Sequence, residues 1–190
     1  MPSPPAIPFN DLVRGVAELR HELDAALARV LDSGWFVLGS EGRAFEEEFA
    51  AAAGVAHAVG VGSGTDAIEL ALRALGIGPG DEVVTQANTC VPTVSAIERA
   101  GATPVLCDVE PEAGTMDPDS LRGALGPKTC AVVPVHLYGQ CADVEAIVDL
   151  CSDRGIAVVE DCAQAVGAEL RGRPAGTIGT LGCFRQIPRD

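Results

Sequence analysis

Residues 156–164 read Ile-Ala-Val-Val-Glu-Asp-Cys-Ala-Gln, in which an apolar run, predicted as a strand over residues 156–160, leads into two adjacent carboxylates, Glu160 and Asp161. A run without polar alternation is typical of a strand that is buried on both faces. Similar runs occupy residues 57–61, 82–85, 104–107 and 130–135, and helical patterns separate them at residues 65–75, 92–99, 118–125 and 143–154. Strands that alternate with helices form right-handed crossovers. The sequence therefore predicts an α/β fold with a mostly parallel sheet flanked by helices.

Two amphipathic helices are expected before the first of these runs. Apolar residues recur at spacings of three and four between Leu12 and Val30, with Asn10 as the expected cap and Ser33-Gly34 as the end. A second helix is predicted over residues 40–53, where Gly54 stops it. No internal repeat or linker interrupts the chain, so residues 1–190 are expected to form one unit.

Composition limits the classes of partner. The 190-residue chain carries 27 acidic and 13 basic residues, a net charge of −14, which disfavours a nucleic-acid partner. Its apolar runs fall short of the roughly 20 residues that span a bilayer, and we expect a cytoplasmic protein without a membrane partner. The seven cysteines are odd in number and form no Cys-x-x-Cys pair, so we expect free thiols and no metal site.

A glycine-rich loop at residues 60–67, Gly-Val-Gly-Ser-Gly-Thr-Asp-Ala, leads from the first apolar run into a helix. Backbone amides and hydroxyls at a helix N-terminus favour a phosphate. The alternative is an ordinary helix cap at Ser63 or Thr65. A dinucleotide-binding loop is disfavoured, because the glycines at positions 60, 62 and 64 do not follow the Gly-x-Gly-x-x-Gly spacing.

Polar residues follow two other runs, where ligands of parallel sheets collect. Glu160 and Asp161 are expected to point to opposite faces and to have separate roles. One of them is a candidate partner for a protonated ring nitrogen, and the alternative is a carboxylate that caps the next segment. His136, near Tyr138, is either a base or substrate contact or, as we favour, a structural histidine with satisfied hydrogen bonds.

Several ordered motifs, taken together, resemble one enzyme family. They are His-Ala-Val-Gly-Val (57–61), Ser-Gly-Thr-Asp-Ala (63–67), Leu-Gly-Ile-Gly-Pro-Gly-Asp-Glu-Val (75–83), Pro-Val-His-Leu-Tyr-Gly (134–139) and Glu-Asp-Cys-Ala-Gln-Ala (160–165). Up to about Phe184 the chain resembles the DegT/DnrJ/EryC1/StrS family of sugar aminotransferases, which use pyridoxal 5'-phosphate (PLP) and have fold type I.

The resemblance implies roles for individual residues. Ser63, Gly64 and Thr65 would hold the PLP phosphate, Asp161 would pair with the pyridinium nitrogen, and Gln164 would contact the phenolic oxygen. It also implies transfer of an amino group from glutamate or glutamine to a nucleotide-linked keto sugar or ketocyclitol. Homodimers with sites at the subunit interface are implied for the full-length form.

The chain departs from the family pattern at two positions. Cys90 stands where the family usually has an aromatic ring that stacks on the cofactor, so we treat Cys90 as a cofactor-facing residue. Asp190 occupies the place of the Schiff-base lysine, and the sole lysine, Lys128, lies at the start of a predicted strand. A carboxylate is unable to form a Schiff base.

We therefore expect an incomplete PLP-binding large domain without the C-terminal small domain, as a truncated or frameshifted reading frame would give. This chain would bind PLP or pyridoxamine 5'-phosphate (PMP) non-covalently and would not complete transamination on its own. The alternative is a non-catalytic PLP/PMP-binding module, or a regulatory subunit of a full-length paralogue. Family members that dehydrate sugars with PMP carry a histidine in place of the Schiff-base lysine, a pattern that Asp190 does not match.

Overall fold

A five-stranded parallel sheet forms the centre of the computed structural model, which describes residues 11–185. The strands lie in the order β2-β1-β3-β4-β7, and each neighbouring pair is parallel. The α/β prediction is confirmed, because four predicted runs form strands within two residues of the expected bounds. Their bounds are β1 (Glu82–Gln86), β2 (Thr103–Cys107), β3 (Thr129–Val133) and β4 (Ala157–Asp161), followed by β7 (Leu181–Cys183).

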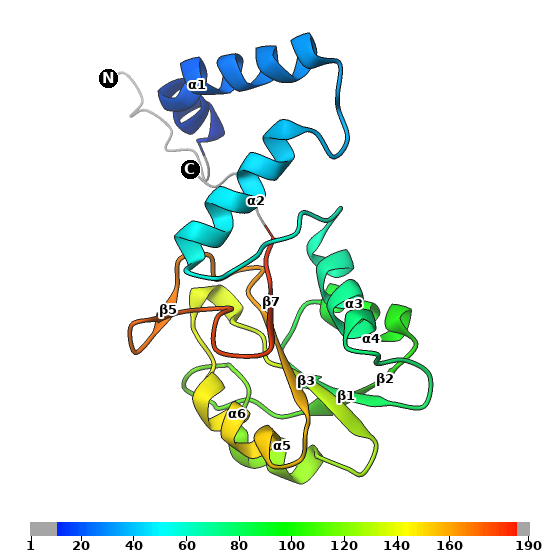
Figure 1. The fold of residues 1–190 in the computed structure, drawn as a ribbon. Coiled ribbons are helices and arrows are strands. Elements are labelled where there is room, and N and C mark those ends of the chain that lie inside the picture. The colour runs from blue at the N-terminus through cyan, green and yellow to red at the C-terminus, as the bar shows by residue number, and fades with distance from the viewer. Residues whose placement is uncertain (1–10, 186–190) are drawn as a thin grey trace, which may run out of the picture.

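Helices cover both faces of the sheet (Figure 1). On one face, α3 (Gly64–Ala74) and α4 (Val91–Ala100) pack on a core that includes Val159 of β4. On the other face, α5 (Pro118–Ala124) and α6 (Val144–Ser152) pack on a core that includes Val158. Because side chains alternate along a strand, Asp161 continues the α3/α4 face and Glu160 continues the α5/α6 face.

The N-terminal helices α1 (Leu12–Ser33) and α2 (Ser40–Ala53) lie at one end of the sheet domain (Figure 1). The side chain of Asp11 caps α1 by accepting a hydrogen bond from the Arg14 amide, so the cap expected at Asn10, outside the described residues, is displaced by one position. The Phe49 ring of α2 packs edge-on against Phe184, with 5.1 Å between centroids. Through this contact, α2 reaches the end of β7.

One predicted strand is wrong. Residues 57–61 form no strand, and the side chains of Val59 and Val61 are 79% and 40% exposed. The backbone amide of Gly60 donates to Glu46 Oε1 rather than to a neighbouring strand. An apolar run predicts a buried strand only where neighbours cover it, and here α2 supplies a side-chain acceptor instead.

Three short strands follow β4 without a clear pattern in the sequence. A hairpin of β5 (Glu169–Leu170) and β6 (Arg173–Pro174) precedes β7. Glycine is required along this path, since a Cβ at Gly182 would lie 2.4 Å from the Gly176 carbonyl oxygen. Within residues 11–185, none of the helices has the length and apolar character needed to cross a bilayer. All seven cysteines are free, as predicted, and Cys90 is exposed.

Candidate functional site

The start of α3 and the ends of β4 and β7 lie together at the C-terminal edge of the sheet. Asp161 ends β4 and pairs with Cys183 of β7. Gly64, at the start of α3, lies against Arg185, since a Cβ placed at Gly64 would be 3.2 Å from the Arg185 Cβ. Arg185 is two residues beyond Cys183, so the start of α3 lies at the same edge as Asp161. The structure thus brings together two of the predicted groups.

Ser63 caps α3. Its hydroxyl oxygen accepts a hydrogen bond from the Asp66 amide at 3.1 Å. This is the alternative role expected for the loop, yet it leaves the hydroxyl hydrogen of the exposed Ser63 free to donate. The amides of Gly64 and Thr65 lie in the first helical turn, where no intrahelical acceptor exists. These donors and the positive end of the helix suit an anion.

Asp161 is a buried carboxylate with donors on each oxygen. Its Oδ2 accepts from the Thr93 hydroxyl of α4 at 2.8 Å, and its Oδ1 accepts from the Ala163 amide at 3.1 Å. Asp161 is 4% exposed, and burial raises the pKa of its carboxyl group despite these two hydrogen bonds. A carboxylate has about four acceptor positions, so each oxygen is able to accept one further hydrogen bond. The Ala163 contact also fulfils the capping role weighed above.

Gln164 and Cys90 lie side by side at this edge. The Gln164 Nε2 group donates to Cys90 Sγ at 3.7 Å, while Gln164 Oε1 accepts from the Tyr138 amide at 3.0 Å. Tyr138 lies in the short helix η1 (Leu137–Gly139) with φ of 57°, a left-handed conformation that is uncommon outside glycine. Cys90 is the N-cap residue of α4, and Gln164 lies in the turn that follows β4.

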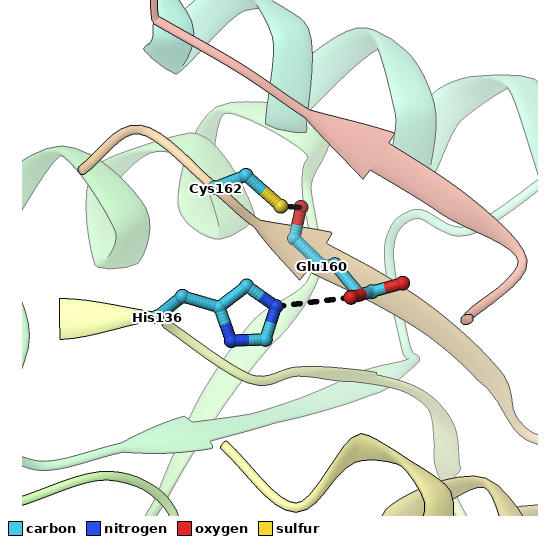
Figure 2. Close-up of side chains that lie close together, drawn as sticks. All are labelled: His136, Glu160 and Cys162. Atoms are coloured by element: carbon cyan, nitrogen blue, oxygen red, sulfur yellow. Dashed lines mark hydrogen bonds and ion pairs between the residues drawn. The ribbon is translucent and has the colours of Figure 1, made fainter. Parts of the chain in front are cut away.

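Glu160 points the other way, into a hydrogen-bonded hub (Figure 2). Its Oε1 accepts from the amides of Ile178 and Gly179, and its Oε2 accepts from the Gly176 amide and from His136 Nε2. Burial by itself raises the pKa of Glu160, but these hydrogen bonds outweigh burial and hold it below the ordinary value. The opposite orientation of the two carboxylates, predicted from strand alternation, is confirmed.

His136 is fully buried and has both ring nitrogens engaged. Its Nδ1 accepts from the Ala142 amide at 3.0 Å, so the ring proton lies on Nε2 and is donated to Glu160. The histidine therefore links the segment after β3 to the end of β4. This is the structural role that we favoured from the sequence.

The ligand atoms of His136, Glu160 and Cys162 lie within 4.8 Å of one another, which is close enough for a metal ion. The lone pairs are already in use, however, because both ring nitrogens and both carboxylate oxygens are hydrogen-bonded. Burial also raises the pKa of the Cys162 thiol far above its ordinary value, which favours the uncharged thiol in this cluster. The cluster fits a structural role.

Lys128 lies at the opposite edge of the sheet. It immediately precedes β3, whereas Asp161 is the last residue of the parallel strand β4. Lys128 is exposed there, and its carbonyl oxygen accepts from the Glu82 amide at the start of β1. This agrees with its predicted position at the start of a strand. Asp190 lies outside the described residues, so its alignment with the family lysine stays a prediction.

Comparison with known proteins decides the family. The model of the DegT/DnrJ/EryC1/StrS aminotransferase family matches residues 17–185. The chain belongs to this family. The resemblance drawn from the sequence motifs is thereby confirmed.

Relatives in the DegT/DnrJ/EryC1/StrS family are about twice as long. The chain is 47% identical to the UDP-N-acetyl-3-dehydro-alpha-D-glucosamine 3-aminotransferase of Acidithiobacillus ferrooxidans, over 96% of this chain and 50% of the relative. It is 48% identical to the dTDP-3-amino-3,4,6-trideoxy-alpha-D-glucose transaminase of Streptomyces venezuelae, over 97% and 48%. The crystal structure of S. venezuelae DesV matches with a TM-score of 0.88 and 50% identity, over 91% and 47%. The chain thus spans about half the length of these relatives.

Two functional features were missed from the sequence. Thr93, which donates to Asp161, lies 68 positions away from it. The amides of Gly176, Ile178 and Gly179 hold Glu160 from a loop with no recognisable pattern. A helix was predicted over residues 92–99, but a threonine within it gave no signal that it would be buried against Asp161.

Proposed function

We propose that this chain forms the cofactor-binding part of a PLP-dependent transaminase that moves an amino group from glutamate or glutamine to a nucleotide-linked keto sugar or ketocyclitol. The observation that carries the proposal is Asp161, a buried carboxylate at the ligand-binding edge of the sheet. Its raised pKa shows that burial outweighs the two donors that reach it. A protonated ring nitrogen would offset that cost.

The charges at this edge match the two ends of PLP or PMP. The hydroxyl of Ser63 and the amides of Gly64 and Thr65 would hold the phosphate, and Asp161 would hold the ring nitrogen in its protonated state. The Gln164 amide, fixed by the Tyr138 amide, would face the phenolic oxygen. When bound, the cofactor supplies an electron-withdrawing ring that carries the amino group between donor and acceptor.

Cys90 would form part of the cofactor site beside Gln164. A thiol has no ring to stack, so we expect looser packing on the cofactor than an aromatic residue would give. Because Lys128 lies at the opposite edge of the sheet, we propose that this chain holds PLP or PMP by non-covalent contacts alone.

The substrate class is supported by the relatives. The names of both aminotransferases compared above place the nitrogen on carbon 3 of a nucleotide-linked hexose. We extend this class of acceptor to the whole protein of which this chain forms the cofactor-binding part. A homodimer in the cytoplasm, without nucleic acid or membrane partners, completes the proposal.

Titration of the purified chain with PMP, followed by absorbance and fluorescence, tests the proposal. We expect saturable binding that Asp161→Asn weakens strongly, because the neutral amide no longer balances the protonated ring nitrogen. Absence of saturable binding by both PMP and PLP would contradict the proposal. Borohydride treatment with PLP, followed by mass analysis, should give no pyridoxyl adduct on Lys128, and an adduct there would contradict the non-covalent part.

The acceptor class is tested separately. The PMP-loaded chain is titrated calorimetrically with a UDP-linked 3-keto hexose and, as the control, with UDP alone and the free hexose. We expect the nucleotide-linked keto sugar to bind more tightly than either part. Equal affinity for the free hexose would contradict recognition of the nucleotide.

A further inference from the structure

Thr93 contacts the carboxylate of Asp161 directly. Its hydroxyl is 2.8 Å from Asp161 Oδ2, in a residue that is 1% exposed. Thr93 is in the first turn of α4, where its own amide donates to the Cys90 carbonyl oxygen at 3.1 Å. The hydroxyl is therefore carried by a fixed backbone position at the start of a helix.

The direction of hydrogen bonding is set by the charge. An ionised carboxylate only accepts, so the single hydroxyl hydrogen of Thr93 is donated to Asp161. Thr93 Oγ1 then accepts from the hydroxyl of Thr89, 2.9 Å away. A chain of two hydroxyls thus runs from the half-buried Thr89 to the buried carboxylate, and each donor polarises the next.

We propose that Thr93 is a positioning residue that fixes the plane of the Asp161 carboxylate and keeps it ionised for a protonated ring nitrogen, with Thr89 as its supporting donor. The inference rests on the proposed function, since it names the residue that prepares Asp161 for the cofactor. Thr93 on Oδ2 and the Ala163 amide on Oδ1 hold opposite ends of the carboxylate. Rotation of the carboxylate would break both hydrogen bonds.

Other groups near Asp161 do not replace this role. The His136 ring is bonded to Glu160 and to the Ala142 amide, and Glu160 points away from Asp161. Cys162 follows it in sequence and Cys183 faces it from β7, and both thiols stay neutral because burial raises their pKa values, that of Cys183 to about 12. Thr93 is the donor that α4 presents to this carboxylate.

The test uses Thr93→Val, which keeps the side-chain shape and removes the hydroxyl. The ionisation of Asp161 is followed by carbon-13 NMR of its carboxyl group in the chain without cofactor, with the signal assigned by its loss in Asp161→Asn. We expect Thr93→Val to raise the titration midpoint and to weaken PMP binding by about tenfold or more, as expected for loss of a hydrogen bond to a charged group. Thr93→Ser should restore both values toward those of the wild type.

Thr85→Val is the matched control. Thr85 is also a buried threonine, but its hydroxyl donates to the Val133 carbonyl oxygen at 2.8 Å. We expect Thr85→Val to leave the Asp161 midpoint and PMP affinity unchanged. An unchanged midpoint in Thr93→Val, or an equal rise in Thr85→Val, would overturn the inference.

Thr89→Val keeps the inference testable if Thr93→Val does not fold. It removes only the donor to Thr93, so a smaller rise of the same midpoint is expected, and no rise would overturn the inference. The two proposals fail separately. A wild-type chain that binds no PMP contradicts the proposed function, while the Asp161 midpoint still decides the role of Thr93.

Discussion

Glu160 and Asp161 are neighbours in β4, yet their side chains lie in contrasting environments. Glu160 accepts four hydrogen bonds and its pKa is lowered, whereas Asp161 accepts two and its pKa is raised. One strand end therefore carries a carboxylate that the fold satisfies and one that it leaves partly unsatisfied. Perturbed ionisation of this second kind is typical of binding and catalytic sites.

The largest expected difference between the two is in stability. Glu160→Gln keeps one oxygen but places an amide where backbone donors point, so we expect the free energy of unfolding to fall by about 3 kcal/mol or more. Asp161→Asn should change it by less than about 1 kcal/mol, because the amide accepts from Ala163 and donates to the Thr93 oxygen. Urea unfolding of both variants measures the difference. Equal losses would contradict the comparison.

His136, like Glu160, is expected to contribute to stability and not to cofactor binding. His136→Phe leaves the Ala142 amide without its acceptor and removes one donor from Glu160, so a loss of about 2 kcal/mol in unfolding free energy is expected. PMP affinity should stay unchanged, as checked by fluorescence titration. A strong loss of PMP binding in a variant that remains folded would place His136 in the site instead.

Acidification should change the contributions of the two carboxylates to stability in opposite directions. The folded pKa of Glu160 lies below the ordinary 4.5, so its stabilisation is complete above that pH and is lost as the pH falls through the folded pKa. The folded pKa of Asp161 lies above the ordinary 3.8, so its destabilisation is relieved as the pH falls through that pKa.

Urea unfolding across this acidic range provides the measurement. Glu160→Gln should make the loss of stability with acidification shallower, and Asp161→Asn should make it steeper. In each variant the number of protons taken up on unfolding should change by at most about one. A shift of the same sign in both variants would contradict the opposite pKa directions.

Ser63 contributes to stability as the cap of α3 and is also a proposed contact of the cofactor phosphate, and both effects are expected to be smaller than those above. Ser63→Ala removes the cap of α3, and we expect it to lower the unfolding free energy by about 1 kcal/mol. Ser63→Asp keeps a capping oxygen but adds a negative charge, so it should preserve stability while weakening PMP binding. Thermal unfolding and PMP titration test this pair. Unchanged PMP affinity in Ser63→Asp would argue against a phosphate at this helix end.

Much of the sheet and the face of each carboxylate could be predicted from the sequence. Uninterrupted apolar runs located β1, β2, β3 and β4, and strand alternation placed Glu160 and Asp161 on opposite faces. The run at residues 57–61 misled because apolar composition does not show whether a neighbouring strand covers it. Strand β7 was missed because its pairing with β4 depends on a close glycine approach rather than on an apolar run.

The candidate site was only partly predictable. Ser63, Gly64, Thr65, Cys90, Asp161 and Gln164 were named from loop position and family resemblance. Their mutual contacts required the fold, since Cys90 and Gln164 are 74 positions apart and Thr93 and Asp161 are 68 apart. The four donors that satisfy Glu160 come from two segments, so no local pattern distinguished it from its neighbour.

The most direct test of the account is the equilibrium affinity of the chain for PMP, compared between wild type and Asp161→Asn at matched stability. The account predicts saturable binding by the wild type and a loss of about tenfold or more in Asp161→Asn, with an unfolding free energy that differs by less than about 1 kcal/mol. Equal PMP affinity in the two proteins would contradict the assignment of Asp161 as the carboxylate that pairs with the protonated ring nitrogen of the cofactor.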